Sequence, residues 1–86
     1  MRLDQFLKES RIIKRRTLAK QMCDGGYVFV NSKKTKAAYN IKAGDEVEIY
    51  FKHKKIKYMI DNIPKKGTKK SEASNYYTMI GEEYYE

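Results

Sequence analysis

The segment RIIKRRTLAK, residues Arg11–Lys20, decides the fold of this chain. Its two adjacent isoleucines are expected to pack the corner between two helices. Five Arg and Lys side chains fall within these ten residues, just before and within the first turns of the second helix. The positive end of a helix dipole disfavours bases at that position. A phosphate would stabilise them and accept the free N–H groups of the first turn, so the segment predicts a phosphate-binding surface.

Two short helices flank this corner. Leu3, Phe6 and Leu7 share one face at helical spacing, which predicts a helix over residues 3–9. Leu18, Ala19, Met22 and Cys23 do the same for a helix over residues 15–24. Asp24-Gly25-Gly26 ends the second helix, because glycine adopts the left-handed conformation after a helix without steric cost. Arg15 and Arg16 are then expected on its solvated side.

After Gly26 the apolar period changes from 3.6 to 2. Residues 27–30 and 56–60 read as strands, and the clearest strand covers residues 46–51, where apolar and polar side chains alternate. Asn31-Ser32 reads as a turn and residues 52–55 as a charged hairpin loop. The sequence therefore predicts an α+β fold in which two short N-terminal helices pack on a small antiparallel sheet.

The charge of the chain is large and unevenly placed. Nineteen Lys and Arg against eleven Asp and Glu give a net charge of +8, and all the bases lie between Arg2 and Lys70. Such asymmetry points to a polyanionic partner, either nucleic acid or an anionic membrane surface. A merely solvated charged helix face is the alternative. Few apolar residues accompany the basic segment, which makes insertion into a membrane surface the weaker reading.

The chain divides into two parts by composition. We predict a nucleic-acid-binding domain over residues 1–63, followed by a basic linker and an acidic, tyrosine-rich, flexible tail over residues 64–86. The tail acids Glu82, Glu83 and Glu86 are expected to lie over the basic face and to compete weakly with RNA. A purely solubilising tail is the alternative.

The remaining reactive side chains do not form a catalytic group. Cys23 reads as a core thiol, and His53 as an exposed loop residue without metal-ligating neighbours. Tyr27 and Phe29 either stack on bases or cover the helices. A single cysteine, no signal peptide and no long apolar run indicate a cytoplasmic protein. We expect no enzyme activity, no cofactor, no metal and no membrane partner.

Three blocks of the sequence carry a family resemblance. Residues 2–26 (RLDQFLKESRIIKRRTLAKQMCDGG), 27–31 (YVFVN) and 42–49 (KAGDEVEI) resemble the RNA-binding domain first described in the fourth protein of the small ribosomal subunit, the S-four (S4) domain. Within it, the chain is most similar to the stand-alone bacterial proteins of the RqcP type, which are related to the fifteen-kilodalton heat-shock protein. The resemblance implies the alpha-L RNA-binding fold.

The resemblance also implies a function in ribosome-associated quality control. Such proteins bind an obstructed large ribosomal subunit and contact its rRNA and the peptidyl-tRNA. They hold the tRNA while a partner protein directs the addition of a C-terminal tail. A role in ribosome recycling or assembly, as for the heat-shock relative, is the alternative. We expect a monomer.

The same resemblance implies which residues bind RNA. Carried over by motif, they are Arg2, Arg11, Lys14, Arg15, Arg16, Thr17 and Lys20, followed by Asn31, Lys33 and Lys36. The family usually has Asn-Gly where this chain has Asn31-Ser32. Because serine tolerates positive φ less easily than glycine, a different type of turn is expected here.

Overall fold

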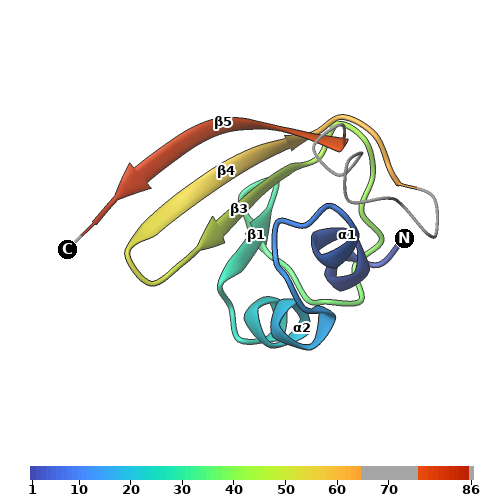
Figure 1. Cartoon of the computed structure of the whole chain (residues 1–86), viewed down its shortest axis with the longest axis horizontal. Coiled ribbons are helices and arrows are strands. Elements are labelled where there is room, and N and C mark those ends of the chain that lie inside the picture. Colours follow the sequence, from blue (N-terminus) through green and yellow to red (C-terminus); the bar gives the residue numbers. More distant parts are fainter. Residues whose placement is uncertain (65–75, 86) are drawn as a thin grey trace.

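A computed structural model describes residues 1–64 and 76–85. Two helices and five strands follow one another in the chain (Figure 1). They are α1 (Leu3–Glu9), α2 (Arg16–Asp24), β1 (Val28–Val30), β2 (Lys33–Lys34), β3 (Glu46–Tyr50), β4 (Lys54–Ile60) and β5 (Tyr77–Tyr84). The strands form one antiparallel sheet in the order β2-β1-β3-β4-β5. The predicted α+β class, with its two N-terminal helices, is confirmed.

The sheet buries one face against the helices. Val28 lies opposite Ile49, and Ile49 opposite Ile56, so apolar side chains cross the strands in rows. All three are buried, together with Leu3, Phe6 and Leu7 of α1 and Ala19 and Cys23 of α2. Figure 1 shows that the helices cover only one end of the sheet, while the β3–β4 turn and the end of β5 project beyond them as an arm.

The end of α2 positions the start of β1. The Gly26 N–H donates to Cys23 and the Tyr27 N–H to Met22, and Gly26 has φ +90°. These two bonds form a Schellman motif, in which the left-handed residue is glycine as expected. Leu18 differs from expectation, because its side chain is 45% exposed instead of facing the core. None of the helices in residues 1–64 and 76–85 is long and apolar enough to cross a membrane.

The turn between β1 and β2 corrects one prediction. Asn31 and Ser32 have φ values of 51° and 71°, and Val30 pairs directly with Lys33 across them. A two-residue turn with positive φ at both positions is the kind that Asn-Gly normally makes. The expectation of a different turn type is therefore wrong: the twist of the paired strands imposes the left-handed conformation on Ser32 despite its Cβ.

The C-terminal segment corrects another. Residues 77–84 do not form a flexible tail but pair with β4 as the edge strand β5. The Tyr77 ring packs edge-on against Tyr58 with centroids 5.2 Å apart. Glu82 and Glu83 form ion pairs with Lys54 and Lys55 of β4, and so do not lie over the helices. The predicted linker at residues 65–75 and Glu86 lie outside the described residues.

Candidate nucleic-acid interface

The α1–α2 connection presents bases because Ile13 is buried beneath it and the partly buried Ile12 packs against the core. Ile13 is buried and its N–H donates to Leu7, which fixes the corner as predicted. Arg11 adopts φ 65° directly after the end of α1. Arg11, Lys14 and Arg15 are exposed, and within residues 1–64 and 76–85 none of the three forms an ion pair.

The N-terminus of α2 is left open to an anion. Arg15 is the N-cap residue, and its side chain makes no capping hydrogen bond. The Ala19 N–H donates to the Arg15 carbonyl, so Arg16, Thr17 and Leu18 occupy the first turn, whose N–H groups have no partner within a helix. No acidic residue lies in this turn. Free N–H groups beside exposed bases are the combination that suits a phosphate.

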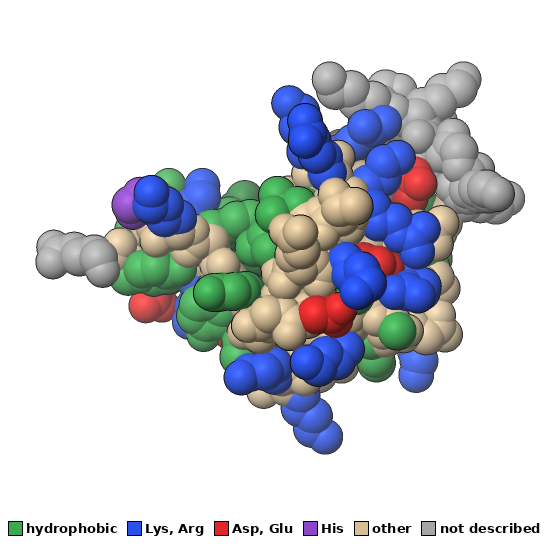
Figure 2. Space-filling model, turned by 90° about the horizontal axis from the view of Figure 1, so that it is seen from below, with side chains coloured by type: hydrophobic (Ala, Val, Ile, Leu, Met, Phe, Trp, Pro, Cys, Tyr) green, Lys and Arg blue, Asp and Glu red, His purple; other side chains and the backbone are tan. Residues whose placement is uncertain are grey.

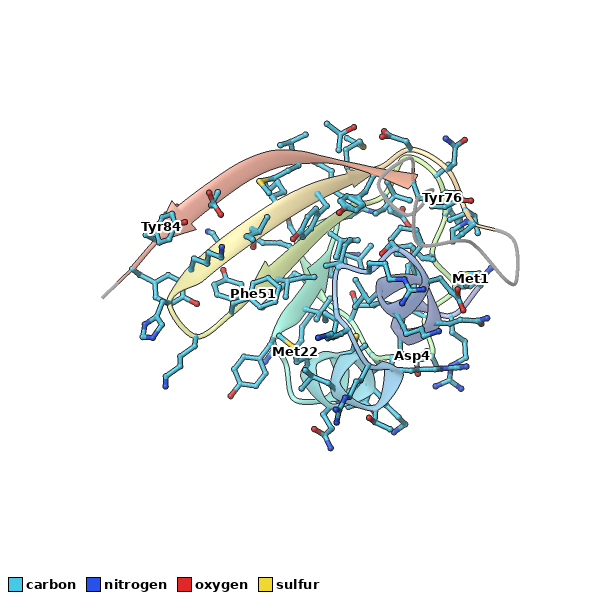
Figure 3. The ribbon with its side chains drawn as sticks, in the orientation of Figure 1. Met1, Asp4, Met22, Phe51, Tyr76 and Tyr84 are labelled. Atoms are coloured by element: carbon cyan, nitrogen blue, oxygen red, sulfur yellow. The ribbon has the colours of Figure 1, made fainter. Side chains whose placement is uncertain are left out.

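Two of the predicted residues, Arg2 and Arg16, share one buried carboxylate. Asp4 is only 1% exposed, and its Oδ1 lies 3.1 Å from Arg2 Nε. Its other oxygen, Oδ2, lies 3.5 Å from Arg16 Nε. Both arginine side chains remain nearly half exposed. Asp4 therefore fixes two guanidinium groups at the surface between α1 and α2. Figure 3 shows Asp4 at this junction of the two helices.

A second carboxylate organises the other end of α2. Asp24 Oδ2 lies 3.0 Å from Lys20 Nζ, while Asp24 Oδ1 accepts the Ala37 N–H at 3.0 Å. Lys36 Nζ donates to the Asp24 carbonyl at 3.3 Å. The Ala37 N–H and, after it, Lys20 lower the pKa of Asp24 below its ordinary value. Asp24 thus brings Lys20 and Lys36 together although sixteen positions separate them.

Asn31 is held mainly by the protein itself. Its side-chain amide donates to Asp45 and its Oδ1 accepts the Glu46 N–H, both at 3.0 Å. Asp45 is 8% exposed and also accepts a hydrogen bond from Tyr39. Asn31 therefore fixes the turn that carries the neighbouring exposed Lys33. Its predicted role as an RNA contact stays a prediction.

The structure brings most of the predicted bases to one side of the molecule. Figure 2, seen from below and thus from the side of the helices, shows Lys and Arg side chains gathered over this part, with few acidic ones among them. We call the residues at the two ends of α2 the basic face: Arg2, Arg11, Lys14, Arg15, Arg16, Lys20 and Lys36. Asp4 and Asp24, which position four of these bases, were missed by the sequence reasoning. One sequence feature could have indicated the role of Asp4: it is an acid placed two residues after Arg2 and directly after Leu3, on the apolar face of α1.

Of the two placements left open for Tyr27 and Phe29, the structure favours the one in which they do not pack into the helix-facing core. Val28 and Val30 are buried in the core, so Phe29 lies on the opposite face of the sheet. Tyr27 is 55% exposed, and the Phe29 ring packs edge-on against Tyr50 at 5.5 Å. Phe29 thus lies away from the helices, whereas the Tyr27 ring touches only the C-terminal end of α2, at Gly25.

Comparison with known proteins agrees with these features. The S4 domain family model matches residues 1–47. A curated relative from Bacillus subtilis, named RQC P-site tRNA stabilizing factor, is 47% identical over 83 residues, which cover 96% of this chain and 95% of the relative. A Streptococcus pneumoniae protein of the same name is 44% identical, over 95% of this chain and 92% of its own length. These matches include the β5 segment, which the S4 domain model does not.

Solved structures show the same fold. Heat Shock Protein 15 of Vibrio cholerae, solved as a trimer, aligns with a TM-score of 0.85 and 28% identity, over 93% of this chain and 81% of that one. The solution structure of the hypothetical protein HP1423 aligns with a TM-score of 0.70 and 31% identity, over 94% and 98% of the two chains. The chain therefore belongs to the S4 domain family and, within it, to the family of the RQC P-site tRNA stabilizing factors.

Proposed function

We infer that this protein binds an obstructed large ribosomal subunit in the cytoplasm, contacting its rRNA and the peptidyl-tRNA in the P site. In this role it stabilises the tRNA while a partner protein directs tailing of the stalled nascent chain. The observation that carries the proposal is the basic face around the uncapped N-terminus of α2, in a chain whose relatives are named for P-site tRNA stabilization.

The basic face supports a function in binding RNA phosphates and not a function in catalysis. Arg2 and Arg16 are fixed by Asp4, so their planar guanidinium groups lose little side-chain entropy when they bind a phosphate. Arg11, Lys14 and Arg15 add charge that no described acid neutralises. A small, rigid surface that carries several cations can hold two RNA elements in fixed positions relative to each other without catalysing a reaction. We therefore propose a monomeric binding factor without a cofactor.

Ribosome recycling is the second candidate function. The similarity to Heat Shock Protein 15 favours it, since the two structures align with a TM-score of 0.85 over 93% of this chain. Both functions use the same basic face, and they differ in whether the subunit carries tRNA when it binds.

The test is affinity purification of the protein from bacterial cells, with sequencing of the bound RNA. We expect large-subunit rRNA together with tRNA, and no enrichment of small-subunit rRNA. Recovery of large-subunit rRNA without tRNA would favour recycling or assembly. Lys14→Glu should abolish the enrichment, whereas Lys42→Glu, an equal charge change at an exposed base outside the basic face, should preserve it. Equal recovery by both variants would contradict the proposed site.

A further inference from the structure

An aromatic groove lies next to the basic face, and none of the residues of the basic face lines it. The groove has a volume of about 670 Å³ and is lined by Gly26, Tyr27, Phe29, Tyr50, Phe51, Lys52 and Tyr85. Its volume is within the range of about 300–1,000 Å³ that is typical of small-ligand sites. No carboxylate of residues 1–64 or 76–85 lines it. Figure 3 shows Phe51 where the projecting arm leaves the body of the protein, and Figure 2 shows hydrophobic side chains exposed between the arm and the basic helical part.

Tyr27 forms a fixed wall of this groove. Its N–H donates to Met22 of α2 and its carbonyl accepts the Tyr50 N–H, both at 2.9 Å. A Cβ added to Gly25 would lie 3.3 Å from two atoms of the Tyr27 ring, so the ring leans on this glycine. The side chain is nevertheless 55% exposed, and its hydroxyl has no hydrogen-bond partner within residues 1–64 and 76–85. The ring is thus held in place with much of its surface free.

Two of the other aromatic side chains, those of Tyr50 and Tyr85, are already held by the protein. Tyr50 donates to Glu48 at 3.3 Å, and Lys55 Nζ lies 5.5 Å from the centroid of its ring. The Tyr85 hydroxyl donates to the carbonyls of Phe51 and Lys54, which fixes residue 85 against the β3–β4 turn. The groove is therefore largely pre-formed, and a planar ligand can enter it without reordering these rings.

Lysines flank the groove and connect it to the basic face. Lys52 lines one side. At Gly26, which also lines the groove, an added Cβ would lie 3.4 Å from Lys34 Nζ, so the Lys34 ammonium group lies over this glycine. Gly26 follows Asp24 by two residues, and Asp24 holds Lys20 and Lys36. A line of bases thus runs from α2 past its C-terminal end to the groove.

Aromatic rings flanked by cations are the arrangement that binds unpaired nucleotides. Bases stack on the rings, and the phosphates on either side contact the lysines. We propose that the groove binds an unpaired nucleotide of the RNA partner, with the base stacked on Tyr27 and the adjoining phosphates on Lys34 and Lys52. This inference rests on the proposed function only in that the partner is RNA. A peptide would also use the aromatic surface, but it would leave the two lysines without phosphates.

The first experiment uses the absence of tryptophan from the sequence. In the Tyr27→Trp variant the only tryptophan reports on the groove. The probe is a single-stranded RNA of about ten nucleotides without self-complementarity. We expect stacking to quench the tryptophan fluorescence, and an oligonucleotide with abasic sites in place of its bases to leave it unchanged. Quenching by an acidic, tyrosine-containing peptide but not by the RNA would overturn the proposal and make the groove a protein-docking site.

The second experiment measures affinity for the same RNA. Tyr27→Ala should weaken binding about 5- to 150-fold, the range for losing one stacked base, while Tyr27→Phe should bind like the wild type. Tyr84→Ala is the matched control, because this 70% exposed tyrosine lies outside the groove. Circular dichroism checks that each variant is folded, and the exposure of Tyr27 favours this. An unchanged affinity for Tyr27→Ala, or an equal loss on the abasic probe, would overturn the proposal.

The two proposals fail separately. If Lys14→Glu loses the large subunit while Tyr27→Ala binds RNA normally, the basic face stands and the groove does not. If neither change weakens binding to any RNA, both proposals are wrong.

Discussion

Arg16, in the first turn of α2, lies 3.5 Å from the buried carboxylate of Asp4 in α1, measured from Nε to Oδ2. Arg16 therefore has two roles, because the same side chain that is exposed toward RNA also joins the two helices. The sequence-based expectation placed it simply on the solvated side. Changing Arg16 to Glu would put a second carboxylate beside Asp4, so such a variant would weaken the fold as well as RNA binding.

Asp4→Asn separates positioning from charge. The variant loses one negative charge, which alone would strengthen binding to RNA. We expect weaker binding instead, because Arg2 and Arg16 lose the carboxylate that holds them. The free energy of unfolding should fall by about 1.5–3 kcal/mol, the usual contribution of a hydrogen bond to a charged group. Urea unfolding and RNA titration measure both effects. Asp61→Asn, at an exposed acid, is the control; tighter RNA binding by Asp4→Asn would contradict the positioning role.

Salt should report how many phosphates the basic face contacts. If about six bases neutralise phosphates, affinity should fall about 10³-fold between 50 and 200 mM salt. Replacing Lys14 and Arg15 together by alanine should lower the slope of log affinity against log salt by about 1.4–1.8. Lys42→Ala should leave the slope unchanged. An affinity that hardly varies with salt would argue for protein contacts in place of RNA.

Acid should release the Asp24 contacts. Because its folded-state pKa lies below the ordinary value of 3.8, Asp24 contributes stability above that pH and loses it as the pH falls further. Asp24→Asn should therefore be less stable than the wild type at pH 7. The difference should stay constant down to about pH 4 and shrink below it. Denaturant unfolding at a series of pH values measures it; a difference that grows on acidification would be the wrong sign.

The β1–β2 turn should be improved by glycine. Ser32 has φ 71°, a conformation that costs an L-residue about 1–2 kcal/mol. Ser32→Gly removes this cost but adds chain entropy to the unfolded state, so we expect a net gain of about 0.5–1 kcal/mol. Gly44→Ala is the reciprocal control. Gly44 has φ +93° and open space where a Cβ would lie, so its loss of stability should come from the backbone alone.

The edge strand β5 should contribute to stability through Tyr77. Tyr77→Ala removes the ring packed on Tyr58 and should lower the free energy of unfolding by about 1–2 kcal/mol. Tyr84→Ala, at an exposed ring near Lys54, should cost about 0.5 kcal/mol or less.

The thiol of Cys23 provides the measurement for the β5 variants. Burial raises its pKa to about 12, so labelling at neutral pH requires opening of the core. Faster labelling is expected for Tyr77→Ala than for Tyr84→Ala. Equal labelling rates would mean that β5 does not stabilise the domain.

Local patterns in the sequence determined the helices, three of the strands and the basic segment. The spacing of Leu3, Phe6 and Leu7 defines α1, and the glycines after Asp24 end α2. The alternation of apolar and polar residues in β3 indicates which of its faces is buried. These features depend on neighbours within a few residues, where periodicity and glycine chemistry act directly.

Only the tertiary structure decided which charges are paired and where the C-terminal segment lies. Asp4 and Arg16 are twelve positions apart, and a pattern of charges does not show that one carboxylate holds two arginines. The β5 segment lacks clean alternation, and its acids suggested a partner in the basic face. Because β5 pairs with β4, Lys54 and Lys55 lie nearer to these acids than the basic face does. The backbone hydrogen bonds between β4 and β5 hold the strand in this position. Ser32 likewise takes a backbone conformation that a residue with a Cβ disfavours. The register of β1 and β2 leaves only two residues for the turn, and a two-residue turn of this kind needs positive φ at both.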